Sequence, residues 1–402
     1  MLPDKIRRGF SRRAFLGGTL AGAVALTAVT LTGCDGGGDS ESTGEPQVIT
    51  DSSKIVNATE DYKETDPGLA AQFSWDLPLG TVPCHSEGAW AALMQAPASA
   101  REINTLGIIS LASGRATTLV GAPTQGSAFS FHDVRCSEKV FAWVEMDYAA
   151  SDWVLVAQQL TNGQLTGEPF KLDEGDANWD PPRLTATGDS VIWYKMPALG
   201  GSKTGEHSHC YRWRAGDAEG KGLWESIGRF AAYPRVSDGI LTIAPRVKND
   251  DGVFYGITAL NLDGGNQMVD QLVMPQTVVP FEAVYMGQSF AFSVEANYNT
   301  GGSLGNMGTF IGREGGPFVF LSREPLACVA GKGSRYLVKV QSSHFVLDTD
   351  AQTFGVLTAP DKTLEYGDYP ASAGMTDRFV TFATVRGDTG LPEAVRMRVF
   401  AL

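Results

Sequence analysis

The chain lacks most of the patterns that identify a redox protein, a metalloprotein or a nucleotide-dependent enzyme. Its 402 residues include five cysteines but no Cys-x-x-Cys pair, so neither a zinc ribbon nor a thioredoxin-type site is supported. The Gly-x-Ser-x-Gly, His-Glu-x-x-His and P-loop motifs are all missing. No cofactor pattern is present either, and we therefore expect no cofactor.

Helical periodicity is also missing after about residue 60. No stretch repeats apolar residues at positions i, i+3, i+4 and i+7 over three turns. Short alternating segments separated by turn residues are present instead. Residues 180–196 are representative, with a short strand, a Thr-Gly-Asp turn and a more apolar strand. This pattern predicts an all-β domain.

The strand–turn–strand form occurs seven times. Aligned on the third residue of the first strand, the copies are spaced by 44 to 52 residues. A period of this length is typical of a β-propeller, in which each repeat folds as one four-stranded sheet around a central channel. The repeats therefore predict seven four-stranded blades. The aligned residues are Cys84, Arg135, Arg183, Arg235, Ala283, Ala327 and Ala371.

The last repeat ends at Leu402, before a fourth strand can form. Residues 71–78, which precede the first repeat, alternate well enough to be a strand. We expect them to supply the missing outer strand of the last blade, which would tie the ends of the ring and protect an open sheet edge. The propeller domain would then span residues 66–402.

The N-terminal residues resemble a bacterial export signal. Ser-Arg-Arg-Ala-Phe-Leu at 11–16, with Arg12 and Arg13, resembles the twin-arginine (Tat) motif. The apolar stretch that follows ends in Leu-Thr-Gly-Cys, which resembles the lipobox of bacterial lipoproteins. The resemblance implies that residues 1–33 are a signal peptide, that Cys34 is acylated, and that the protein is anchored to the bacterial cell membrane on its extracytoplasmic side. A plain transmembrane anchor is the alternative.

Residues 34–65 are predicted to be the acylated cysteine and a flexible tether, because their first part is rich in Gly, Ser and acidic residues. Beyond residue 33 the chain has 27 basic and 44 acidic residues, a formal charge of −17. Such an acidic body argues against nucleic acid as a partner, because phosphate repels it. The acyl chains, rather than the protein surface, would hold the protein at the membrane.

Three successive repeats place an arginine at the same aligned position. Because the first strand of each blade lines the central channel, we expect these arginines to form an arc near the channel mouth. Guanidinium groups suit carboxylate, sulfate or phosphate, so the arc would bind an anionic ligand. The alternative is that each arginine pairs with a carboxylate such as Asp133, Asp180 or Glu282. The three arginines are Arg135, Arg183 and Arg235.

Two long polar loops, at 197–208 and 297–308, are expected on the same face as the arc and are candidates for ligand binding or simple surface segments. Several aromatic residues could stack on a sugar ring. They are Tyr148, Trp153, Trp179 and Tyr298.

Two residue pairs raise the question of a metal or a disulfide. His207 and His209 lie on one side of an extended segment, but no convincing third ligand is evident, so we predict no metal site. Cys84 and Cys136 lie on the inner strands of neighbouring blades and are the only pair suited to a disulfide. An inner cysteine is more often a small buried apolar residue.

The body is similar in outline to the TolB-like and other seven-bladed propellers of bacterial envelope lipoproteins. The arginine arc beneath the long polar loops favours an anchored protein that binds a ligand or partner on its loop-rich face: an anionic small molecule, a glycan or a protein. Two alternatives stay open. One is an extracytoplasmic glycan-active hydrolase or lyase that uses the same channel mouth. The other is a structural scaffold of an envelope complex, which predicts a broad exposed apolar patch.

Overall fold

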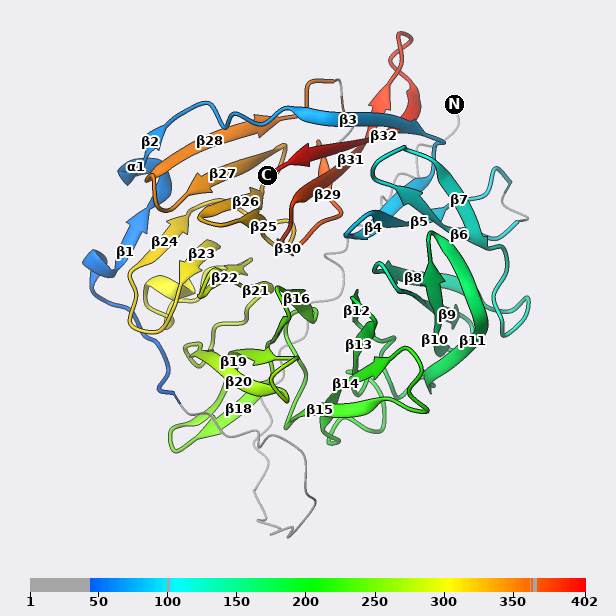
Figure 1. Cartoon of the computed structure of the whole chain (residues 1–402). Helices are drawn as coiled ribbons and strands as arrows, with labels where there is room; N and C mark the ends of the chain where they lie inside the picture. Colours follow the sequence, from blue (N-terminus) through cyan, green and yellow to red (C-terminus); the bar gives the residue numbers. More distant parts are fainter. Residues whose placement is uncertain (1–43, 100–101, 362, 364–366) are drawn as a thin grey trace, which may run out of the picture. The chain divides into compact units, whose positions relative to one another are not determined.

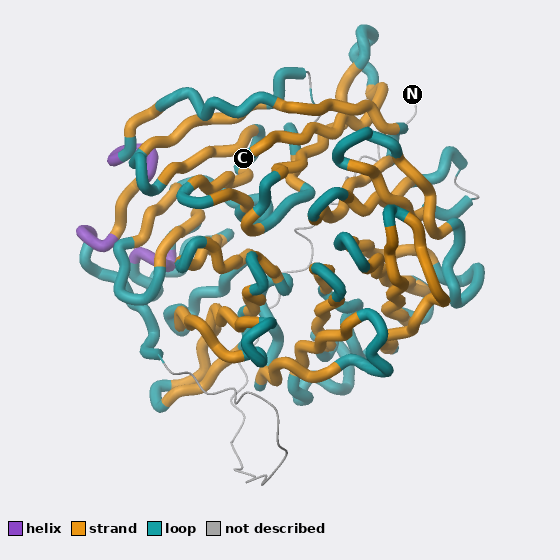
Figure 2. Tube along the Cα trace, in the orientation of Figure 1, coloured by secondary structure: helices purple, strands orange, loops and turns teal. Residues whose placement is uncertain are grey.

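The computed structural model describes residues 44–99, 102–361, 363 and 367–402. They belong to one compact unit, residues 37–402. In this unit, antiparallel sheets surround a common centre and form an all-β propeller (Figure 1). Strands and loops make up nearly all of it (Figure 2). Arg12, Arg13 and Cys34 lie outside the described residues.

In the first three sheets, four strands follow one another outward in chain order (Figure 1). The first sheet contains β4 (Thr81–Glu87), β5 (Trp90–Gln95), β6 (Thr105–Ser110) and β7 (Ala116–Val120). The second contains β8 (Ser130–Cys136), β9 (Val140–Asp147), β10 (Asp152–Thr161) and β11 (Gln164–Gly175). The third contains β12 (Leu184–Thr187), β13 (Ser190–Lys195), β14 (Ser208–Arg214) and β15 (Lys221–Ser226).

The following sheets keep this order and add short pieces. One contains β16 (Arg235–Ser237), β17 (Ile240–Ile243), β19 (Gly252–Asn261) and β20 (Gln267–Val273), with β18 (Arg246–Asn249) paired to the start of β19. The next contains β21 (Glu282–Met286), β22 (Ser289–Val294), β23 (Gly308–Gly312) and β24 (Phe318–Leu321), with the 3-10 turn η3 (Ser303–Gly305) between β22 and β23.

The chain then forms β25 (Ala330–Lys332), β26 (Arg335–Lys339), β27 (Ser343–Asp348) and β28 (Thr353–Thr358). Short β30 (Gly374–Met375) pairs in parallel with β25. The last sheet contains β29 (Tyr369–Pro370), β31 (Arg378–Arg386), β32 (Pro392–Ala401) and β3 (Ala71–Leu77).

The core lies in layers between neighbouring sheets. The middle strands are therefore apolar on both faces, as in β9, where Val140 to Val144 are all buried. Trp153 and Trp193, both almost fully buried, fill the layer between the second and third sheets. β-branched and aromatic residues suit such strands because they pack well on a pleated surface.

An N-terminal belt, residues 44–77, runs along the outer edges of three sheets (Figure 1). After the 3-10 turn η2 (Ser52–Lys54), β1 (Ile55–Asn57) pairs in parallel with β24. Beyond helix α1 (Ala58–Asp61), β2 (Lys63–Glu64) pairs in parallel with β28. The flexible tether predicted for residues 34–65 is therefore wrong for these strands, because outer sheet edges supply partners for their backbone groups.

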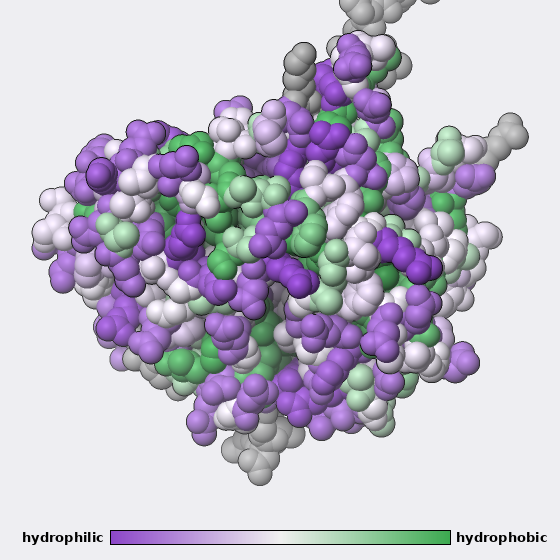
Figure 3. Space-filling view, turned by 45° about the horizontal axis from the view of Figure 1, so that its top comes forward, coloured by the Kyte–Doolittle hydropathy of each residue, from purple (hydrophilic) through white to green (hydrophobic). Residues whose placement is uncertain are grey.

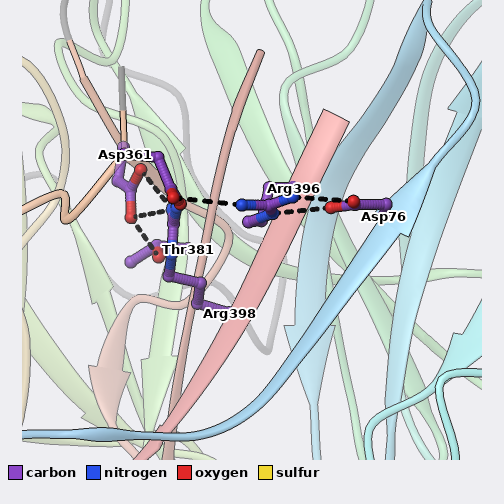
Figure 4. A network of polar contacts seen from close by, with 6 residues as sticks. Asp76, Asp361, Thr381, Arg396 and Arg398 are labelled. Atoms are coloured by element: carbon purple, nitrogen blue, oxygen red, sulfur yellow. Dashed lines mark hydrogen bonds and ion pairs between the residues drawn. The ribbon is translucent and has the colours of Figure 1, made fainter. Parts of the chain in front are cut away.

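The third part of the belt closes the ring. β3 pairs antiparallel with β32, which confirms the prediction that residues 71–78 complete the last sheet. Side chains reinforce this clasp (Figure 4). Asp76 on β3 accepts from Arg396 on β32 at 2.6 and 2.7 Å. The side chain of Arg396 is 29% exposed, so this pair is open to solvent.

A second arginine, which is buried, lies two residues further along the same strand. Arg398 donates to both carboxylate oxygens of Asp368 at 2.7 Å, and it also contacts Asp361. Thr381 donates to Asp368 at 3.1 Å. Arg398 is 2% exposed, so its charge depends on these carboxylates for compensation.

Candidate functional site

The two faces of the propeller differ in their connections. Because neighbouring strands run antiparallel, the connections from second to third strand lie on one face, together with those from each outer strand to the next inner strand. We call this the loop face. The turns between first and second strands and between third and fourth strands lie on the opposite face.

The three arginines of the predicted arc lie on neighbouring inner strands but not at one level. Arg135 and Arg235 each pair across the first hairpin with a residue seven positions later. In the third sheet the residue with that spacing is Thr185. Arg183 precedes Thr185 by two residues, toward the loop face, and its carbonyl accepts from Tyr194 N at 3.0 Å. It is therefore about 7 Å nearer the loop face.

Arg135 is neutralised inside the protein. Its Nη1 donates to Asp133 Oδ1 at 2.6 Å and to Val134 O at 2.9 Å. Its Nε donates to Leu184 O at 3.3 Å. The residue is only 9% exposed, so its donors serve the packing of the first strands. The alternative of a carboxylate partner holds for this arginine.

Arg235 is neutralised in the same way. Its Nε and Nη2 donate to the two oxygens of Glu282 at 3.1 and 2.9 Å, a bidentate pair. Burial alone would lower the pKa of Arg235, but the Glu282 carboxylate outweighs burial and holds that pKa above its usual range. This arginine therefore stays charged and is already paired.

Arg183 differs from the other two. Its Nη1 donates to Ala231 O at 2.5 Å, and its Cζ lies 5.3 Å from the centre of the Tyr233 ring. Across the described residues it has no carboxylate partner. The carboxylate of Asp180, the partner expected from sequence, contacts Arg229 instead. Arg183 is half-buried, and its backbone lies on the loop-face side of the inner strands.

Tyr233 joins two of these arginines and was not singled out from the sequence. Its ring centre lies 5.3 Å from Arg183 Cζ and 5.4 Å from Arg235 Cζ, so both guanidinium groups are within cation–π range. The sequence offers a weak signal for it, since Tyr233-Pro-Arg places the ring two residues before an arc position. Beneath them, Tyr194 stacks on Phe230 at 4.0 Å, and its buried hydroxyl has no partner in the described structure.

A histidine–tyrosine pair lies on the loop face of the second sheet. His132 Nδ1 is 3.0 Å from the hydroxyl of Tyr148, which is 60% exposed. His132 lies at a register shift in β8, between Phe131 and Asp133. Bulges of this kind commonly redirect a side chain. Partial desolvation by the surrounding protein lowers the pKa of His132 and outweighs the opposing effect of the Asp133 carboxylate, while Arg135 contributes in the same direction as desolvation.

The first long polar loop, at 197–208, is held against the body. Asn178 Oδ1 accepts from Ser202 N and Ser202 Oγ at 3.0 and 2.8 Å. Lys203 Nζ lies 4.8 Å from the centre of the Trp179 ring. This lysine covers one of the aromatic residues proposed for sugar stacking. Trp153, another of them, is completely buried.

The second long loop, at 297–308, lies beneath the N-terminal belt. Ser303 N donates to Ile49 O at 2.8 Å, and Ile49 and Gly302 form a parallel bridge. Leu304 is fully buried, and Tyr298 is half-buried. The loop therefore contributes mainly to the attachment of the belt.

The remaining candidates are explained by local contacts. His207 contacts Glu225, and the described residues contain no group of three metal-ligating side chains. No disulfide joins Cys84 to Cys136, the suggested pair, in the described part of the chain. Burial raises the pKa of the Cys136 thiol well above its usual range, so it remains protonated.

None of the described helices has the length and apolar character needed to span a membrane.

Comparison with known proteins identifies only the fold. Neither the family models nor the curated protein sequences give a match. The β-propeller domain of the Trilobed protease from Pyrococcus furiosus is similar, with 11% identity, a TM-score of 0.52, and coverage of 81% of this chain and 96% of that one.

Two enzyme structures are similar in the same way. A prolyl endopeptidase gives 12% identity and a TM-score of 0.52, with coverage of 80% of this chain and 50% of that one. A puromycin hydrolase gives 12% identity and a TM-score of 0.51, with coverage of 81% and 52%. The chain thus spans about half the length of these two enzymes. At such identities the likeness concerns architecture, and the chain is a β-propeller.

Proposed function

We propose that the protein is a propeller of the bacterial cell envelope that binds an anionic ligand at the loop-face mouth of its channel. The observation that carries this proposal is Arg183. Arg135 and Arg235 are paired with carboxylates, whereas Arg183 uses one donor on a backbone carbonyl and has no carboxylate partner in the described structure. The guanidinium fork suits a carboxylate, sulfate or phosphate group, and Tyr233 lies against it.

A solution assay with a matched control tests this site. The protein is titrated with sulfate, phosphate, acetate and glucuronate while its thermal unfolding is followed. An anion at about one hundred times its dissociation constant stabilises the folded state by about 2.7 kcal/mol. Arg183→Gln should abolish that stabilisation. Arg246→Gln should retain it, because Arg246 also stacks on a tyrosine, at 3.7 Å from the Tyr255 ring centre, but in another sheet.

The outcome separates two roles for Arg183. Equal stabilisation of wild type and Arg183→Gln by every anion would refute the site. If no anion stabilises wild type and Arg183→Gln unfolds at a lower temperature, Arg183 has a structural role.

An extracytoplasmic glycan-active enzyme is the second candidate. The His132–Tyr148 pair on the loop face favours it, because these groups could transfer a proton and stack on a sugar ring beside Asp133. Turnover of acidic oligosaccharides by wild type, lost in His132→Gln, would support an enzyme. For the scaffold alternative, the face seen in Figure 3 offers apolar residues interspersed with polar ones rather than one broad patch.

The anchor and the number of blades complete the proposal. We propose seven blades, one for each hydrogen-bonded sheet, with β30 at the edge of the sheet that contains β25; six blades is the alternative. Arg12 and Arg13 would direct Tat export, and Cys34 would carry the acyl chains. Intact-mass analysis of the membrane fraction tests the acylation, and Cys34→Ser should release the protein from that fraction.

A further inference from the structure

The exposed apolar side chains of the propeller are unevenly distributed. Several lie in connections of the loop face or where an inner strand begins there. Leu199 and Leu391 are 64% and 67% exposed at connections between second and third strands. The complete group on this face is Leu79, Val82, Tyr148, Leu199, Val279 and Leu391.

The opposite face has a different surface. Within the described residues, its turns contain no exposed large apolar side chain. Val48 is exposed in the N-terminal belt, and the other exposed apolar residues lie within strands, as Met268 and Val269 do on β20 and Val356 does on β28. The two faces of the propeller therefore differ in the exposed apolar side chains of their connections. This difference indicates a role that is specific to the loop face.

The arrangement of these side chains favours a fluid surface. They are distributed over several connections of the loop face, where Leu79 and Val82 share one connection and the others lie on separate ones. A stable protein complex usually buries about 1,200 Å² or more of matched surface. A bilayer interface accepts isolated leucine and tyrosine side chains at any lateral position, because lipid packs around each of them.

The N-terminal belt approaches the same face. Ile49 lies against Gly302, within the connection between β22 and β23. Only about ten residues separate Gly44 from Cys34, and an extended chain of that length spans at most about 35 Å. If Cys34 carries lipid, as proposed above, the loop face is held near the bilayer and even weak contacts are reinforced by the tether.

We propose that the loop face docks directly on a zwitterionic phospholipid bilayer, with its apolar loop tips in the lipid interface. This contact is additional to the acyl anchor and rests on the proposed acylation only for its orientation. The formal charge of −17 beyond residue 33 makes anionic lipid less favourable. Binding should therefore be stronger to phosphatidylcholine than to mixtures with phosphatidylglycerol.

Vesicle flotation without the acyl anchor tests the proposal. Residues 35–402 contain the whole compact unit and are mixed with phosphatidylcholine vesicles. The tip variant changes Leu79, Leu199 and Leu391 to Ser. The matched control changes Met268, Val269 and Val356 to Ser, which removes three exposed apolar side chains from strands.

We expect the tip variant to lose at least tenfold in vesicle partitioning and the control to change less than threefold. Leu391→Ser alone should lose part of the vesicle binding, because Leu391 lies at the tip of a hairpin. This single variant still tests the proposal if the triple variant fails to fold. Absence of wild-type binding at millimolar lipid, or equal loss in both triple variants, would overturn the proposal and leave a protein partner as the occupant. The anion titration above contains no vesicles, so the two proposals can fail independently.

Discussion

Protonation of Glu87 should control the stability of the propeller near neutral pH. This residue ends β4, and its Oε1 accepts from Gly188 N at 2.8 Å and from Thr187 Oγ1 at 3.3 Å. Burial raises the pKa of Glu87 to about 7, since it outweighs these two hydrogen bonds, and the negative charge of Glu138 acts in the same direction as burial. The folded state therefore prefers the neutral acid.

The sign and size of the effect follow from this shift. Below about pH 4.5 the carboxyl is protonated in both states and costs nothing. Between about pH 4.5 and 7 the unfolded chain is ionised while the folded chain is not, so the free energy of unfolding falls as pH rises. The span is about 2.5 pH units at 1.36 kcal/mol each, which gives an upper limit of about 3 kcal/mol above pH 7.

Glu87→Gln mimics the neutral acid and can still accept from Gly188. Urea unfolding from pH 4.5 to 8.5 should show no difference from wild type at the acidic end and a gain of up to about 3 kcal/mol at pH 8. The exposed Glu174→Gln removes the same charge and is the matched control. A difference between Glu87→Gln and wild type that does not change with pH would refute the reasoning.

Three further substitutions separate buried from exposed polar contacts. Arg398→Met should destabilise the protein by about 3 to 5 kcal/mol in urea unfolding, because it leaves the buried Asp368 carboxylate uncompensated. Asp76→Ala should cost no more than about 1 kcal/mol, and less in high salt, because its pair with Arg396 is exposed; a loss as large as that of Arg398→Met would contradict this ranking. Glu145 is fully buried and accepts four hydrogen bonds, three of them from residues 124–125. Glu145→Ala should cost about 3 kcal/mol and accelerate amide exchange in 121–129, whereas unchanged exchange there would show that the loop is held by other contacts.

The sequence predicted an all-β propeller because the repeat is long and regular. Alternation marked the residues of β3 as a strand, and the missing fourth strand of the last repeat identified its partner. The other belt strands could not be recognised in this way. β1 and β2 have three and two residues, too few for any period to appear, and their partners are outer edges that close in space only after the sheets form.

The candidate site was predictable only in part. Alignment placed Arg135, Arg183 and Arg235 on inner strands, but it could not show that Arg183 lies one pleat nearer the loop face. That offset depends on where the β12–β13 hairpin turns, which is set by hydrogen-bond register. The partners of Arg135 and Arg235 were among the carboxylates suggested from sequence. Tyr233 lies between two arginines because neighbouring sheets pack together, and no local sequence pattern encodes that packing.

The clasp between β3 and β32 has a consequence for synthesis of the chain. Asp76 and Arg396 are separated by 320 residues, so the strand that closes the ring is translated long before its partner. At about 5 to 20 residues per second, roughly 16 to 64 s pass between the synthesis of β3 and that of β32. During that time the sheets between them can form one after another on the growing chain, but the circle stays open. The ring therefore cannot close until β32 has emerged from the ribosome, after all the sheets between the two strands.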